Sequence, residues 1–134
     1  MRSHALLPLS VLTGVALGIA GTAALGAYQA TPAAYVVAEE DVTDPQTFQQ
    51  YAAQVPATLT PFGGHYLVRN GRSVSLEGEP PRRFVIVAFK SLDKARAWYD
   101  SPAYSAIRPI RQRASKTRGF IVEGIPLTSA KSPL

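Results

Sequence analysis

The chain has 134 residues, with 14 basic and 9 acidic side chains, and so a formal net charge of +5. This length suits a single domain, and the absence of cysteine excludes disulfides, thiolate metal sites and cysteine nucleophiles. Only two histidines are present, one of them His4 near the N-terminus, so a histidine-rich site is excluded and we expect no metal and no cofactor.

Residues 1–30 have the layout of an export signal. Arg2 is followed by an uncharged, largely apolar stretch from Ala5 to Ala27 that ends in small residues suited to cleavage. The stretch is also long enough to cross a bilayer, which takes about 20 residues. The sequence therefore predicts a signal peptide or, if uncleaved, a membrane anchor at residues 5–27. In both cases we expect an exported protein, either periplasmic or secreted.

A strand and a helix are expected next. The β-branched run at residues 35–39 predicts the strand, and Asp44 followed by Pro45 is typical of a helix start. Pro56 is expected to kink or end this helix. Its buried face is predicted from the apolar residues at three- and four-residue steps: Phe48, Tyr51, Ala52, Val55 and Leu59.

A glycine pair, Gly63-Gly64, separates this helix from a second predicted strand at residues 65–68. The pair follows a helix and precedes a strand, which is the reverse of the order in dinucleotide and phosphate loops. It therefore indicates a helix stop with close backbone approach. Asn70-Gly71 predicts a tight turn, residues 73–76 a short return strand, and the apolar run 83–89 a strand covered on both faces.

Two helices and a last strand complete the pattern. Ser91 is expected to cap one helix, and Ser101-Pro102 to start another that Pro109 bends. Residues 120–122 predict the last strand, and residues 126–134 a flexible tail. The residues expected to face inward on the two helices are Leu92, Ala95, Trp98, Tyr99, Tyr104, Ile107, Ile110 and Ala114.

This order of elements predicts an α+β fold of the ferredoxin-like βαββαβ type over residues 34–125. Helices can cover only one face of such a sheet. The strands at 35–39 and 83–89 are nevertheless apolar on both sides. We therefore expect the open face to pack against a second copy of the chain, as a homodimer.

A series of motifs runs through this region: FGGHYLVRNG at residues 62–71, LEG at 76–78, FVIVAF at 84–89, ARAWYDSPAY at 95–104 and VEG at 122–124. Together they resemble the domain of unknown function 1330 family, which belongs to the dimeric α/β-barrel superfamily. The resemblance implies a homodimer with face-to-face sheets and no particular reaction. Related superfamily members include cofactor-free monooxygenases, small-molecule isomerases and haem-binding enzymes. Family members often carry Arg where this chain has His65, and Glu where it has Ala88.

Candidate catalytic residues are His65 and Asp44. His65 is the only histidine after the leader and can exchange protons near neutral pH, or it is a surface or hydrogen-bonded strand residue. Asp44 can act as a general base, although its capping role also explains it fully. An acidic edge formed by Glu39, Glu40, Asp41 and Asp44 offers oxygen ligands to a hard cation, but it lacks the ligand spacing of such a site and is expected to be solvated.

Candidate ligand-binding residues are Arg111, Tyr104, Trp98 and Gly64. Arg111 is the best anion clamp because a guanidinium matches carboxylate or phosphate in a bidentate manner, unless an acidic neighbour pairs with it. Trp98, Tyr99 and Tyr104 lie at helical spacing and are expected mostly in the core, although one phenol can point its polar tip into a pocket. Gly64 allows close backbone approach. The basic stretch at residues 108–118 has no interleaved aromatics, so no nucleic-acid partner is expected.

Three functions remain open. The first is an exported homodimer that binds a small, partly apolar anionic ligand through His65, Tyr104 and Arg111. The second is a cofactor-independent monooxygenase- or isomerase-like enzyme, in which His65 or Asp44 takes a proton and Arg111 stabilises an enolate-like anion. The third is a structural dimer that touches the membrane only through its uncleaved leader. The enzyme requires His65 or Asp44 to share one concave pocket with Arg111.

Overall fold

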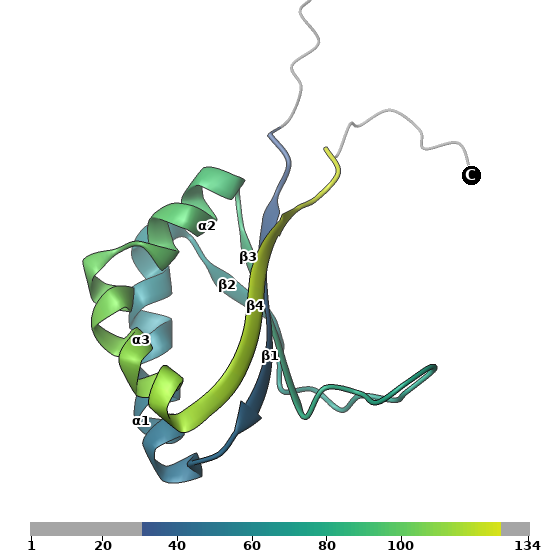
Figure 1. The fold of residues 1–134 in the computed structure, drawn as a ribbon. Helices are drawn as coiled ribbons and strands as arrows, with labels where there is room; N and C mark the ends of the chain where they lie inside the picture. Colours follow the sequence, from purple (N-terminus) through teal and green to yellow (C-terminus); the bar gives the residue numbers. More distant parts are fainter. Residues whose placement is uncertain (1–30, 127–134) are drawn as a thin grey trace, which may run out of the picture.

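Residues 31–126, which the computed structural model describes, form a four-stranded antiparallel sheet with three α-helices on one face (Figure 1). The strands lie in the order β2-β3-β1-β4. This is the predicted α+β fold of the ferredoxin-like βαββαβ type, which is therefore confirmed. In chain order the elements are β1 (Ala34–Val42), α1 (Pro45–Leu59), a 3-10 turn η1 (Thr60–Phe62), β2 (His65–Arg69), β3 (Arg83–Phe89), α2 (Leu92–Tyr99), α3 (Pro102–Ala114) and β4 (Ser115–Glu123).

Two predicted segments lie outside the described residues. They are the export signal or anchor at residues 1–30 and the tail from residue 127 onward. Among the described residues, no helix is long and apolar enough to span a lipid bilayer.

The three α-helices begin where the sequence predicts or within one residue of it, because a side-chain oxygen caps each one. Asp44, Ser91 and Ser101 hold extended backbone conformations and accept hydrogen bonds from the first turn. Pro45 and Pro102 occupy the first turn, where a missing N–H costs nothing. The oxygen-to-nitrogen distances are 3.1 Å for Asp44 to Thr47, 3.2 Å for Ser91 to Lys94 and 3.2 Å for Ser101 to Tyr104.

Pro56 does not end α1, which continues to Leu59. A proline in a helix interior lacks the N–H that would bond to the carbonyl four residues earlier, here that of Ala52. The guanidinium of Arg69, on β2, donates a hydrogen bond to this carbonyl oxygen at 3.3 Å. A side chain from the sheet therefore satisfies the acceptor that the proline leaves free, and the helix can continue.

The predicted return strand at residues 73–76 is absent, and residues 71–80 form an exposed loop. β2 pairs directly with β3, so the chain passes from one strand to the other through this loop without a strand between them. The loop projects from the side of the sheet away from the helices (Figure 1). Tyr99, expected to be buried, is 37% exposed at the last residue of the short helix α2.

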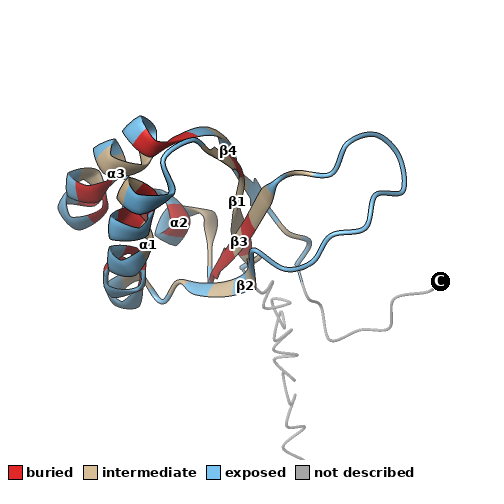
Figure 2. Cartoon of the chain, turned by 90° about the horizontal axis from the view of Figure 1, so that it is seen from below, coloured by how far each residue is buried: buried red, intermediate tan, exposed pale blue. Residues whose placement is uncertain are grey.

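The core lies between the sheet and the helices, where the buried residues gather (Figure 2). Within residues 31–126, no helix covers the opposite face of the sheet (Figure 1). On β4, Phe120 is 46% exposed and Val122 is 44% exposed. Their register partners on β1 are Val37 and Tyr35, so these four side chains share that open face.

Candidate ligand-binding site

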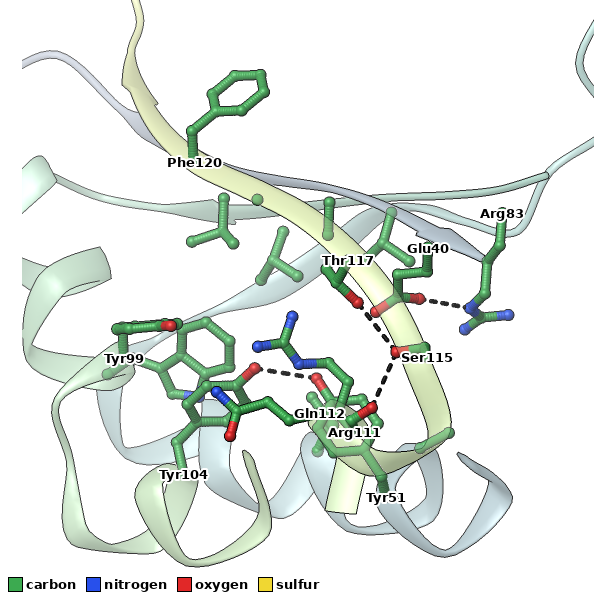
Figure 3. A pocket seen from close by; sticks show the side chains of 18 of the residues that line it. Glu40, Tyr51, Arg83, Tyr99, Tyr104, Arg111, Gln112, Ser115, Thr117 and Phe120 are labelled. Carbon is green, nitrogen blue, oxygen red and sulfur yellow. Dashed lines mark hydrogen bonds and ion pairs between the residues drawn. The ribbon is translucent and has the colours of Figure 1, made fainter. Parts of the chain in front are cut away.

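A cavity of about 580 Å³ lies between the sheet and the helices, within the range of sites that hold small molecules. All four strands and all three α-helices contribute to its lining. Figure 3 shows polar side chains from the helices facing polar side chains from the sheet. Its apolar walls include Val36, Val55, Val85, Val87 and Ile121.

Arg111 reaches the cavity from the last turn of α3. Its Nε is the one fully buried side-chain nitrogen or oxygen among residues 31–126 that has no hydrogen-bond partner. Arg111 also forms no salt bridge within that range, so it is not neutralised by a neighbouring acid. Buried donors in proteins are nearly always paired, and an unpaired charged donor beside a cavity indicates a place for a bound acceptor.

Two buried phenols lie beside Arg111. The hydroxyl oxygens of Tyr51, on α1, and Tyr104, on α3, are 3.0 Å apart. Burial raises the pKa of both residues above the ordinary value of 10, while the charge of Arg111 acts in the opposite direction on both. Both phenols are therefore neutral near neutral pH. One of the two phenols donates its O–H to the other. The second phenol therefore keeps an O–H that can donate to a ligand.

Glu40, on β1, faces Arg111 across the cavity from the sheet side (Figure 3). It is 5% exposed, and Arg83 donates to its Oε2 at 2.7 Å. The two residues are register partners on β1 and β3. The prediction of a solvated acidic edge is thus wrong for Glu40. The alternation of Val36, Ala38 and Glu40 along one strand was the signal that could have revealed its inward direction.

Trp98 lines the cavity with its ring rather than with its N–H. The indole nitrogen donates to Thr58 Oγ1 at 3.0 Å, so this buried donor is already satisfied. The ring packs against Tyr104, with their centroids 4.1 Å apart. Trp98 therefore contributes an aromatic wall to the cavity.

The structure separates the other three candidates from this cavity. His65 is exposed at the start of β2 and Asp44 is exposed at the start of α1, and neither lines the cavity. Hydrogen bonds from Thr47 lower the pKa of Asp44, as expected for a helix cap. The geometric requirement for proton transfer by His65 or Asp44 beside Arg111 is therefore not met.

Gly64 lies against the core rather than against the cavity. A Cβ added there would approach Phe89 Cε1 to 2.6 Å and Leu59 Cδ2 to 2.9 Å. The structure thus brings together Arg111 and Tyr104 with Trp98. Within residues 31–126 no group of three His, Cys, Asp or Glu side chains lies where it could hold a metal ion.

Comparison with solved structures shows proteins of similar fold. A protein of unknown function from Rhodopseudomonas palustris has a TM-score of 0.57 at 14% identity, over 70% of this chain and 83% of its own. A dimeric ferredoxin-like protein of unknown function from Thermobifida fusca scores 0.50 at 15% identity, over 72% and 94%. SnoaB, a cofactor-independent oxygenase from Streptomyces nogalater, scores 0.50 at 15% identity, over 78% and 98%. At these identities the likeness shows a shared fold.

A comparison with functionally curated proteins gives no match. A family model described as "Domain of unknown function (DUF1330)" does match, over residues 33–125. The match spans the whole sheet and all three helices, and it confirms the family resemblance of the sequence motifs. The chain therefore belongs to the DUF1330 family.

Proposed function

We propose that the protein is an exported homodimer that binds a small, partly apolar anion in the cavity between its sheet and its helices. The observation that carries this proposal is Arg111, which lines the cavity and whose buried Nε has no hydrogen-bond partner among residues 31–126. A guanidinium in that position favours a carboxylate or another planar anion. The valine-rich walls and Trp98 suit an apolar or aromatic ligand body.

The homodimer is supported by the open face of the sheet. This face exposes apolar side chains on β4, including Phe120 and Val122, that a second copy of the sheet would cover. A structurally similar protein from Thermobifida fusca is described as dimeric. Export is supported by the layout of residues 1–30.

The two alternative functions have less support. A cofactor-independent oxygenase shares the fold, but the two proposed bases, His65 and Asp44, do not line the cavity. A purely structural dimer would give no role to a buried, unpaired charged donor at the edge of a cavity. Ligand binding therefore accounts for more of the structure than either alternative.

Substitution of Arg111 tests the proposal. Calorimetric titration with 2-naphthoate, a flat apolar carboxylate, should show binding by the wild type and at least about tenfold weaker binding by Arg111→Ala. Arg111→Lys should be intermediate, because an ammonium group keeps the charge without the planar fork. Arg113→Ala, two residues away and not in the cavity lining, is the matched control. Equal affinity of wild type and Arg111→Ala would contradict the proposal.

A further inference from the structure

The cavity has a second polar end, formed by Glu40 on β1. Arg83 occupies only one oxygen of this carboxylate, Oε2. A carboxylate has about four lone-pair sites, and among the described residues only Arg83 is bonded to it. Figure 3 shows the other oxygen of Glu40 on the side of the cavity and Arg111 across from it. Glu40 is therefore an acceptor with unused capacity at the sheet end of the cavity.

The opposite charges of Glu40 and Arg111 act on one shared space. Both act on the buried hydroxyls of Tyr51 and Tyr104: the carboxylate raises the pKa of each phenol, and the guanidinium lowers it. The two charges do not pair with each other, since Glu40 is bonded to Arg83 and the Nε of Arg111 has no partner among the described residues. A ligand between them thus meets a donor at the helix end and an acceptor at the sheet end.

Much of the remaining cavity wall is apolar or aromatic, although Gln112, Ser115 and Thr117 also line it. Val36, Val85 and Val87 on the sheet and Trp98 on α2 form apolar and aromatic parts of this wall. A group that only accepts hydrogen bonds finds no donor on Glu40 itself, because a carboxylate only accepts. A hydroxyl or amino group would instead donate to the free carboxylate oxygen.

We infer, resting on the proposed function above, that the cavity selects flat aromatic carboxylic acids that carry a hydroxyl or amino donor at the end remote from the carboxylate. The acid group binds Arg111 and the spare phenol hydroxyl of the Tyr51–Tyr104 pair. The remote donor bonds to Glu40. Glu40 acts here as a specificity-determining residue. A purely structural Glu40–Arg83 ion pair would not discriminate between ligands by their remote substituent.

Two matched probes test this inference. They are 6-hydroxy-2-naphthoate, which carries a remote donor, and 6-methoxy-2-naphthoate, in which the same oxygen can only accept. Calorimetric titration of the wild-type protein should show about tenfold or tighter binding of the hydroxy compound. This comparison needs no variant, so it stands even where a substitution impairs folding.

Glu40→Gln provides the sharper result. Arg83 should hold the amide oxygen of the new side chain, which turns its NH₂ group toward the cavity and replaces an acceptor with a donor. We expect the preference to invert in favour of the methoxy compound. Glu39→Gln is the matched control: Glu39 is the adjacent residue, it pairs with Arg118, and it does not line the cavity. This control should keep the wild-type preference.

The outcomes separate the two proposals. Equal wild-type affinity for the two probes, with both weakened by Arg111→Ala, would overturn the role of Glu40 and leave anion binding intact. The role of Glu40 would also be overturned if the Glu40→Gln variant keeps the preference for the hydroxy compound. A cooperative thermal transition would show that this variant is folded. If neither naphthoate binds the wild-type protein at millimolar concentration, anion binding fails and the selectivity fails with it.

Discussion

The polar atoms of the core differ in whether a protein partner satisfies them. The indole N–H of Trp98 reaches Thr58, and the hydroxyls of Tyr51 and Tyr104 reach each other. Arg111 Nε has no such partner in the part of the chain that the structure describes. Because a buried unpaired donor costs about 1–3 kcal/mol, and more when it is charged, this atom is the one most in need of a ligand.

Gly64 illustrates a residue whose role is packing. Gly64→Ala should destabilise the protein by about 1–3 kcal/mol, because the new methyl group would lie 2.6 Å from Phe89 Cε1 in a closely packed core. Urea unfolding followed by tryptophan fluorescence measures the change. Gly71→Ala is the control: its added methyl group would have nothing closer than Val68 Cγ1 at 4.0 Å. Equal stabilities of the two variants would refute this packing role.

At this scale the candidate site was partly predictable. Arg111, Tyr104 and Trp98 could be named because guanidinium and aromatic groups on a helix carry recognisable chemistry. Glu40 was missed because its neighbours Glu39 and Asp41 do sit at a partly exposed edge, where they pair with Arg118 and Arg82. Three consecutive acids look alike in a sequence, while the pleat of a strand turns the middle one to the opposite face.

The second scale is that of helices and strands, where α1 depends on β2. The helix continues through Pro56, which has no N–H to donate to the carbonyl of Ala52. Arg69 supplies the missing donor from the neighbouring strand, and its guanidinium also lies 4.8 Å from the centre of the Tyr66 ring. The end of α1 is therefore set by a contact between elements and could not be predicted from the helix sequence alone.

A double-mutant cycle tests this dependence. Arg69→Ala should lower the free energy of unfolding of the wild type by about 1 kcal/mol. In a protein that already carries Pro56→Ala, the same substitution should have an effect that is smaller by roughly 0.5–1 kcal/mol. The reason is that alanine restores an N–H that can bond to the Ala52 carbonyl. Free energies of unfolding from urea titrations give the coupling. Arg96→Ala, on the exposed side of α2, should show none. Zero coupling between Arg69 and Pro56 would remove this explanation.

The whole molecule has one covered and one bare sheet face. The helices bury the inner face, and the outer face exposes Phe120 and Val122 beside Val37 and Tyr35. The loop at residues 71–80 projects from this same side (Figure 1). A contiguous apolar surface of this kind is unfavourable in water, and a symmetric pairing of two such faces would remove it from solvent.

Val122→Glu tests the proposed pairing at this scale. The introduced charge should break the dimer into monomers, because two related copies would bring unpaired carboxylates into an apolar interface. Light scattering coupled to size-exclusion chromatography gives the mass, and far-ultraviolet circular dichroism checks the fold. Ala106→Glu, on the exposed side of α3, is the control and should remain dimeric. A wild-type monomer, or a dimer that survives Val122→Glu, would contradict the face-to-face arrangement.

The sequence by itself determined the order of the elements, the three helix caps and the strands with apolar side chains on both faces. These features depend on residues close together in the chain: a cap acts within three residues, and strand and helix periods repeat every two or 3.6. The ferredoxin-like fold and the DUF1330 motifs follow from the same local information.

Only the tertiary structure decided which candidates share a cavity. Arg111 and Glu40 line one cavity because α3 packs across a sheet in which β1 is central. Asp44 and His65 do not line it. The strand predicted at residues 73–76 is another case, since these residues lie in an exposed loop and β2 pairs directly with β3. Such outcomes depend on register and packing between segments far apart in the chain, which no short sequence pattern encodes.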